Sequence, residues 1–196
     1  MKNIILLGAA RAGKTTLAKK LNEELNYSVV NIDDIVTAFE RSFPELEIGN
    51  GNDYEKSKAN LAPFLAHYLG SLSYRSDCNN GIKFVIEGGY FDFEKILPVL
   101  EKYEMKGLKD NFLLIGLFYN KKTVDGIYND LRKYDKEDDW TYNLNEDELR
   151  KFIQSCIGYT EKLYEELKGY DFCIYDVSEE REEIINKIVN DIKSVL

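Results

Sequence analysis

Five short apolar runs alternate along the chain with longer segments in which apolar residues recur every three or four positions. Short apolar runs are typical of buried strands, whereas the wider spacing is typical of amphipathic helices. Regular alternation of the two predicts a parallel α/β sheet, because parallel strands need helical connections between them. The predicted strands cover residues 2–7, 28–32, 82–86, 111–119 and 171–175.

Two long helical insertions interrupt this alternation. The first covers about residues 44–80, between strands two and three, and its helix has leucines on one face. The second covers about residues 120–150, between strands four and five, and contains two predicted helices joined by an acidic segment. Residues at the start of the second of these helices have the spacing of a capping box. The predicted helices are 16–26, 35–43, 53–77, 121–134, 146–168 and 179–192, the leucines are Leu61, Leu65, Leu69 and Leu72, and the capping pair is Asn145 and Glu148.

Composition limits the classes of partner. The chain has 196 residues, 44% of them hydrophobic, which suffices for one buried domain, and it contains no repeat or low-complexity tract. A net charge of −9 disfavours broad contact with nucleic acid or anionic lipid, so small metabolites fit better as partners. No apolar stretch approaches the 18 residues of a membrane span. We therefore predict a single domain over residues 1–196 without a membrane segment.

Cysteine and histidine usage gives no sign of a disulfide framework or a metal cluster. Cys78, Cys156 and Cys173 are odd in number and widely spaced, without a CxxC pair, which favours a reducing, cytoplasmic location. His67, the single histidine, has no clustered second ligand. We expect it to have a helix-surface or packing role.

The segment after the first predicted strand fits the phosphate-binding pattern GxxxxGK[ST] at every required position. It opens a helix, where unpaired backbone N–H groups and the helix dipole favour a triphosphate. In this motif Lys14 contacts the β- and γ-phosphates and the Thr15 hydroxyl ligates Mg²⁺. Thr16 is expected near the phosphates, and Arg11 either contacts phosphate or points to solvent. The residues expected to bind nucleotide here are Gly8, Ala9, Ala10, Arg11, Ala12, Gly13, Lys14, Thr15 and Thr16.

Acidic residues follow the second and third predicted strands, at the sheet edge where ligands of parallel α/β proteins bind. One of Asp33 and Asp34 is a candidate general base, although either could instead cap the next helix. Glu87 could hold Mg²⁺ through water, bind a substrate hydroxyl or be a solvated turn residue. Gly88 and Gly89 after it would let the backbone approach a bound molecule closely.

Candidate residues later in the chain have two interpretations each. Asp176 and Ser178 follow strand five and either contact a nucleotide base or cap the last helix. Arg132, in the second insertion, either neutralises transferring phosphate as an arginine finger does or forms a surface ion pair. Arg41 is a candidate for binding the phosphoryl acceptor, or likewise a surface residue.

These features together resemble the small P-loop kinases, a group that includes adenylate-kinase-like, shikimate-kinase-like and gluconate-kinase-like enzymes. The resemblance rests on the P-loop, the Asp33-Asp34 pair, the Glu87-Gly88-Gly89 turn and the insertion that carries Arg132. It spans nearly the whole chain and extends to uncharacterised bacterial kinase-like proteins. It implies a three-layer α/β/α fold with a five-stranded parallel sheet of order 2-3-1-4-5, an acceptor-side first insertion and a second insertion that acts as a lid.

The resemblance also implies roles for individual residues. Asp34, which precedes a hydrophobic residue, would activate the acceptor hydroxyl, and Asp33 would support Mg²⁺ or orientation. Gly88-Gly89 resembles a turn that touches the acceptor, and the segment 176–178 resembles a base-binding loop. The chain departs from adenylate-kinase-like proteins because it lacks their Asp-Gly-x-Pro-Arg sequence after strand three and a zinc lid of four cysteines. It departs from shikimate-kinase-like proteins because Arg41 and Arg75 are only loosely placed to hold a carboxylate.

The predicted function is transfer of the γ-phosphoryl group of Mg²⁺·ATP to a hydroxyl or phosphate of a small metabolite or nucleotide. The alternative is a nucleotide-dependent switch that hydrolyses slowly and acts through a partner protein. A GTPase would need the base-reading sequence Asn-Lys-x-Asp, whereas residues 120–123 read Asn-Lys-Lys-Thr.

Overall fold

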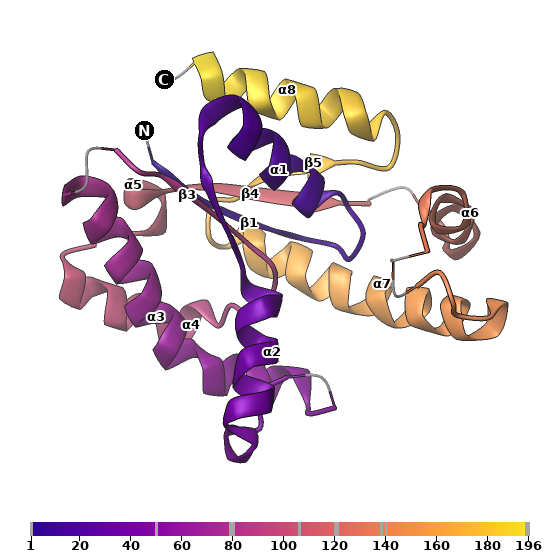
Figure 1. The fold of residues 1–196 in the computed structure, drawn as a ribbon, viewed down its shortest axis with the longest axis horizontal. Helices are drawn as coiled ribbons and strands as arrows, with labels where there is room; N and C mark the ends of the chain where they lie inside the picture. The colour runs from indigo at the N-terminus through magenta and orange to yellow at the C-terminus, as the bar shows by residue number, and fades with distance from the viewer. Residues whose placement is uncertain are drawn as a thin grey trace.

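A central parallel sheet organises the chain. The computed structural model describes residues 2–49, 51–78, 81–105, 107–119, 122–137, 139 and 141–194, with the backbone alone for 75–78. The strands are β1 (Asn3–Gly8), β2 (Ser28–Asn31), β3 (Phe84–Glu87), β4 (Phe112–Phe118) and β5 (Cys173–Asp176). They pair in parallel in the order β2-β3-β1-β4-β5, which confirms the predicted topology (Figure 1).

The strands start later than predicted at two places. β3 begins at Phe84 because its partner β2 begins at Ser28, which pairs with Phe84. Ile82 lies before this pairing and is exposed. β5 likewise begins at Cys173, opposite Ile115 of β4. Neighbouring strands, and not apolar character alone, therefore set where each strand starts.

Helices cover both faces of the sheet, as the predicted three-layer fold requires (Figure 1). α1 (Lys14–Leu25) and α8 (Arg181–Ser194) pack on one face, where the core contains Ile4 and Leu6 of β1. The other face, with Ile5 and Leu7, is covered by α3 (Tyr54–Cys78), α4 (Phe93–Leu100) and α7 (Glu146–Lys168). Successive residues of β1 thus point to opposite faces, and both faces are apolar, as in a buried parallel strand.

The first insertion contains the predicted long helix. The four leucines of α3 are buried, with Leu61, Leu65 and Leu69 at 0% exposure. α2 (Ile32–Ser42) and the short helix η1 (Pro44–Leu46) precede α3. α4 was not predicted as a separate helix and packs against α3, and η2 (Glu101–Tyr103) and α5 (Leu108–Asn111) follow it. His67 of α3 is exposed and contacts the Tyr103 hydroxyl through Nδ1 at 2.9 Å, in agreement with a packing role.

The second insertion consists of α6 (Val124–Tyr134), a loop and the first turns of α7. α7 has the predicted ends, and its capping box is present, since Asn145 accepts from the Glu148 N–H while Glu148 accepts from the Asn145 N–H. Leu131 of α6 packs with Leu149 and Ile153 of α7, away from the sheet (Figure 1). We call residues 122–145 the lid segment; Trp140 and Asn120 lie outside the described residues.

No helix among the described residues is long and apolar enough to cross a membrane.

Candidate active site

The phosphate-binding loop joins β1 to α1 and has the backbone that its glycines allow. Gly8 has φ +140°, and a Cβ there would lie 2.0 Å from the Leu117 carbonyl oxygen, so a side chain cannot fit. Gly13 precedes α1 with φ +95°. No side chain caps α1 and no acidic residue lies in its first turn. Its first N–H groups are therefore left to an anion, as the motif predicts.

Lys14 folds back over this loop. Its ammonium donates to the carbonyl oxygens of Gly8 at 3.2 Å and Ala9 at 2.9 Å. Burial lowers the pKa of Lys14, and the negative charges of Glu87 and Asp33 partly offset that effect. A triphosphate in the loop would supply the counter-charge that the buried ammonium lacks.

Thr15 and Glu87 form an oxygen-rich pair beside Lys14. The Thr15 hydroxyl donates to Oε1 of Glu87 at 3.0 Å, and the Asn31 amide donates to the same oxygen at 3.3 Å. Glu87 is only 3% exposed, and this burial raises its pKa despite the Thr15 bond and the Lys14 charge. A hydroxyl and a carboxylate are ligands that suit Mg²⁺, which otherwise keeps water and phosphate oxygens. The described residues contain no cluster of three His, Cys, Asp or Glu side chains that could hold a metal by themselves, so this pair fits a nucleotide-bound ion.

The N-terminus of α2 presents one aspartate to the cleft. Asn31 caps the helix, since its side chain accepts from the Asp33 N–H at 2.8 Å, and therefore α2 begins at Ile32 and not at the predicted residue 35. Asp33 lines the cleft together with Val36 and Thr37, one turn further along the same helix face. Asp34 is absent from that lining. Partial burial raises the pKa of Asp33, the Lys14 charge opposes this, and the Asp34 charge adds to it.

This arrangement changes the two interpretations of the aspartates. Neither acid is the helix cap, because Asn31 fills that position. The resemblance assigned activation of the acceptor to Asp34, but the structure places Asp33 on the cleft wall and within the field of Lys14. Successive residues of an α-helix are rotated by about 100° around its axis, so the Asp33 and Asp34 side chains point in different directions. Of the two acids, Asp33 is therefore the one that lines the cleft.

The wall opposite the phosphate-binding loop is built by α2, α3 and the turn after β3. We call it the α2–α3 wall. Tyr54 and Tyr90 have ring centroids 4.7 Å apart, and the Tyr54 hydroxyl accepts from the Tyr90 N–H at 2.9 Å. The residues of this wall are Asp33, Val36, Thr37, Tyr54, Glu87 and Tyr90.

The two glycines after β3 do not line the cleft themselves. The Gly88 N–H donates to the Leu6 carbonyl at 3.3 Å, and a Cβ on Gly88 would lie 2.8 Å from Cβ of Ile32. A Cβ on Gly89 would come within 3.2 Å of the Tyr54 hydroxyl. The glycines thus let Tyr54 and α2 approach the end of β3, which shapes the α2–α3 wall.

Arg11 connects the phosphate-binding loop to the lid segment. It has φ 63°, and its guanidinium donates to Asp139 Oδ1 at 2.7 Å and to Asp135. The Thr141 hydroxyl also donates to Asp135, at 2.5 Å. The Arg11 bond lowers the pKa of Asp139 to about 2. Arg11 thus does not point freely to solvent, and its contact with phosphate stays a prediction.

The other predicted arginines lie outside the cleft lining. Arg132 donates to the carbonyl oxygens of Tyr142 at 3.1 Å and of Leu144, so its guanidinium holds the lid loop. Arg41 is exposed in the last turn of α2, about 6 Å beyond Thr37 of the cleft lining at a rise of 1.5 Å per residue, and is not itself part of that lining. The Arg75 side chain lies outside the described residues. Arg150 forms ion pairs with Asp125 and Glu146 at the surface.

Four basic residues that were not predicted as site residues line the cleft, namely Lys19, Lys122, Lys136 and Arg181. Lys122 lies near the Tyr119 ring, and Arg181 lies near Arg11. Arg181, at the start of α8, donates to the Arg11 carbonyl at 3.3 Å and lies 5.6 Å from the Tyr134 ring centroid. Lys122 is ion-paired with Asp130, and burial lowers its pKa, with Arg181 adding to the effect. The only signal of Lys122 and Arg181 in the sequence is a basic residue just beyond strands four and five, at the ligand-binding edge of the sheet.

Asp176 and Ser178 shape the loop before α8. The Ser178 N–H and hydroxyl both donate to Asp176 Oδ1, at 3.0 and 2.5 Å. Neither residue lines the cleft. Their bonds form a local turn that leads to Arg181, and contact of either with a nucleotide base stays a prediction.

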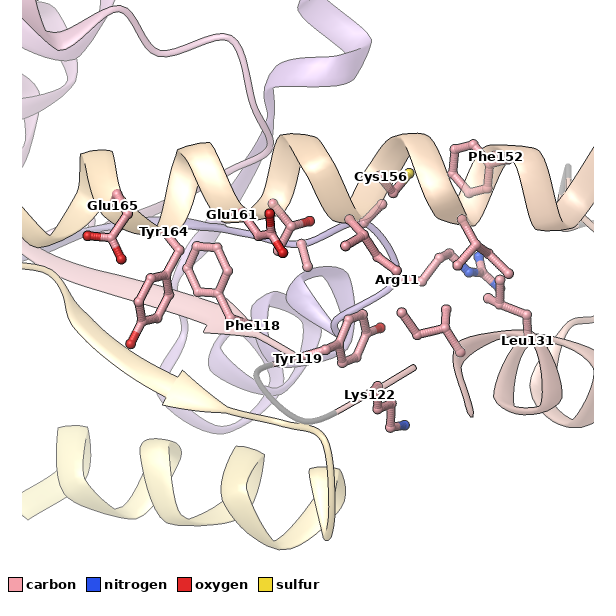
Figure 2. A pocket seen from close by; sticks show the side chains of 16 residues that line it. Arg11, Phe118, Tyr119, Lys122, Leu131, Phe152, Cys156, Glu161, Tyr164 and Glu165 are labelled. Atoms are coloured by element: carbon pink, nitrogen blue, oxygen red, sulfur yellow. The ribbon is translucent and has the colours of Figure 1, made fainter. Parts of the chain in front are cut away.

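The cleft holds about 1070 Å³ and extends from the α2–α3 wall past the phosphate-binding loop to the lid segment. A smaller cavity of about 260 Å³ adjoins it between β4, α6 and α7 (Figure 2). Phe118, Phe152 and Tyr164 line this cavity, while Cys156 and Arg11 border both spaces. Burial raises the pKa of Cys156 to about 11, so its thiol is protonated at neutral pH. The main cleft is large enough for a nucleotide and a second small molecule.

Proteins similar to this chain are found among solved structures. No protein-family model matches the sequence. No curated protein matches it either. A shikimate kinase from Bacteroides thetaiotaomicron is 17% identical, with a TM-score of 0.55 over 98% of this chain and 99% of that chain. A shikimate kinase from Acinetobacter baumannii, solved in complex with shikimate, is 18% identical, with a TM-score of 0.53 over 99% and 94%. A sugar kinase from Janibacter sp. HTCC2649 is 15% identical, with a TM-score of 0.55 over 97% and 93%.

At these identities the similarity concerns the fold. It extends over nearly the full length of each chain, includes the strand order β2-β3-β1-β4-β5, and agrees with a phosphate-binding motif at the end of β1. This chain therefore has the fold of the small P-loop kinases.

Proposed function

We propose that the protein transfers the γ-phosphoryl group of Mg²⁺·ATP to a hydroxyl group of a small molecule. The observation that carries this proposal is that Lys14, Thr15, Glu87 and Asp33 line one cleft, in which the Thr15 hydroxyl of α1 donates to Glu87 of the α2–α3 wall. Phosphoryl transfer needs charge neutralisation, a metal ion and a positioned acceptor rather than protein nucleophiles. The cleft offers groups for each of these tasks.

The phosphate side would bind and neutralise the donor. Backbone N–H groups of residues 10, 11 and 13–15 and the Lys14 ammonium would hold the β- and γ-phosphates, and Thr15 with Glu87 would hold the Mg²⁺ ion. When bound, this ion would offset the charge that develops during transfer. Lys122 and Arg181 stand near the loop and would neutralise further charge. They replace Arg132 in the role of lid cation, because the Arg132 guanidinium is bonded to carbonyls of its own loop.

Asp33 would orient the acceptor hydroxyl and accept its proton. A pKa raised by partial burial makes the Asp33 carboxylate a better base. The Arg11 bonds to Asp135 and Asp139 hold the lid segment over the loop. A closed lid excludes water, which would otherwise compete with the acceptor for the γ-phosphoryl group.

The test is release of ADP by the purified protein with Mg²⁺·ATP, alone and with pooled metabolite acceptors. We expect acceptor-dependent release that Lys14→Ala lowers by roughly 10²–10³-fold, the loss typical of removing a preorganised charge. Lys193→Ala is the matched control and is expected to retain activity, because Lys193 is exposed near the end of α8, pairs with Glu24 and lies outside the cleft lining. Slow release that no acceptor stimulates would contradict the proposal and favour a nucleotide-dependent switch acting through a partner protein.

A further inference from the structure

We propose that the phosphoryl acceptor is a hydroxyl compound without negative charge, and that its uncharged or cationic body lies against the rings of Tyr54 and Tyr90. This inference rests on the proposed function, since it identifies the class of molecule that would occupy the second half of the same cleft.

The α2–α3 wall is acidic and aromatic. Asp33 and Glu87 are its two ionisable acids, Tyr54 and Tyr90 its two rings, and the remaining residues, Val36 and Thr37, are uncharged. None of the six is a cation. Because Glu87 is assigned to the Mg²⁺ ion, an anionic acceptor on this wall would place its charge beside the Asp33 carboxylate in a partly buried site, where like charges repel.

The cations that line the cleft come from its other sides. Arg11 is held by Asp135 and Asp139, and Lys122 by Asp130. The proposed function assigns Lys14 to binding the phosphates of ATP. Lys19 lies one helical turn beyond Thr15 on α1. Within the described lining, the basic residues are Arg11, Lys14, Lys19, Lys122, Lys136 and Arg181, which derive from the phosphate-binding loop with α1, from the lid segment and from α8.

Basic residues elsewhere on α2 and α3 do not belong to the wall. Lys56 pairs with Glu47, and Lys58 pairs with Glu166 at 2.9 Å. Arg41 is exposed in the last turn of α2, one turn beyond Thr37. None of these three residues lines the cleft.

The aromatic part of the wall is held in place before any ligand arrives. The Tyr54 hydroxyl is hydrogen-bonded to the Tyr159 hydroxyl at 2.5 Å and accepts from the Tyr90 N–H. The Tyr159 ring meets the Tyr54 ring edge-on, with centroids 4.7 Å apart. Burial raises the pKa of Tyr54 to about 12, so it stays neutral at physiological pH. Fixed aromatic rings beside carboxylates suit the apolar face of a ring compound or an ammonium group.

The first experiment divides a metabolite extract by anion exchange into a retained pool, which contains carboxylates and phosphates, and an unretained pool. Each pool is added to the protein with Mg²⁺·ATP, and ADP release is measured. We expect the unretained pool to stimulate release at least roughly tenfold more than the retained pool, the factor for about 1.4 kcal/mol. A preference for the retained pool would overturn the inference and leave the proposed kinase function intact. Failure of both pools would overturn the proposed function, and the inference with it.

The second experiment tests the rings with a matched pair of variants. Tyr90→Leu removes the ring and Tyr90→Phe keeps it, and neither changes the charge of the wall. For the active pool, we expect the concentration that gives half-maximal rate to rise roughly tenfold in Tyr90→Leu and to stay near the wild-type value in Tyr90→Phe. The KM for ATP should be unchanged in both, which also shows that the cleft is folded. An unaltered acceptor dependence in Tyr90→Leu would overturn the assignment of the ring contact.

Discussion

The two sides of the cleft are built in different ways. The phosphate-binding loop offers backbone N–H groups at the start of α1, with Gly8 and Gly13 allowing the required conformation and Lys14 supplying charge. The α2–α3 wall offers side chains from three separate elements, among them Asp33 and Tyr90. A backbone cradle suits any triphosphate, because every such ligand presents the same oxygens. A wall of side chains is specific to one class of molecule, so it determines which acceptor binds.

The largest effect on activity is expected from substitution of the aspartates of α2. Asp33→Asn should lower kcat/KM by roughly 10²–10⁴-fold, the range for loss of a general base, whereas Asp34→Asn should change it only slightly. Because burial raises the pKa of Asp33, the acidic limb of the kcat/KM profile against pH should lie above the ordinary value of 3.8. The limb should be absent from whatever activity Asp33→Asn retains. A larger loss in Asp34→Asn would reverse the assignment.

On the phosphate side, Gly8→Ala should destabilise the fold. The new Cβ would lie 2.0 Å from the Leu117 carbonyl oxygen, at a φ that side chains rarely adopt. Overpacking and backbone strain together predict a loss of about 3 kcal/mol or more in the free energy of unfolding, measured by urea denaturation. Gly158→Ala is a suitable control, since a Cβ at that helical position meets no atom within 4 Å. A normal unfolding midpoint for Gly8→Ala would show that the loop relaxes more than this packing implies.

Removal of the Thr15 hydroxyl tests whether this group binds the Mg²⁺ ion. Thr15→Ala should raise the Mg²⁺ concentration needed for half-maximal ADP release by roughly 10–100-fold, the usual cost of disturbing a metal's ligand set. Thr15→Ser keeps the hydroxyl that bonds to Glu87, and so it should retain most of the wild-type Mg²⁺ dependence. Equal dependence in Thr15→Ala and the wild type would place the ion elsewhere.

The smallest effect is expected for the link between the loop and the lid segment. Arg11 lowers the pKa of Asp139 to about 2, below its ordinary value of 3.8. The resulting stabilisation is fully present above pH 4 and is lost as the pH falls through 2. The difference in Tm between the wild type and Asp139→Asn, which leaves the Arg11–Asp135 pair in place, should therefore be small near neutral pH, because the Arg11–Asp139 pair is partly exposed, and should disappear near pH 2. A difference that grows on acidification would contradict the ion-pair assignment.

Sequence patterns were most informative where the chain folds locally. α7 has its predicted ends because Asn145 and Glu148 cap it within one turn, and the phosphate-binding loop was located by its own residues. α4 was missed as a separate helix because it has eight residues, includes Pro98 and is stabilised by packing of Phe93 and Ile96 on the core. The start of α2 was misplaced because its first residue, Ile32, was included in the preceding strand.

The sequence by itself determined the strand order through its resemblance to a known group, the position of the phosphate-binding loop and the pairing of Thr15 with an acid after β3. Tertiary structure alone decided which aspartate faces the cleft, that Arg11 and Arg132 bond to the lid segment, and that Arg181 and Tyr54 reach the site. The physical reason is the range of the interactions. A loop and a helix cap depend on neighbours a few residues away, whereas a cleft wall depends on the rotation of helices and on contacts between residues more than 100 positions apart, such as Arg11 with Asp135 or Tyr54 with Tyr159.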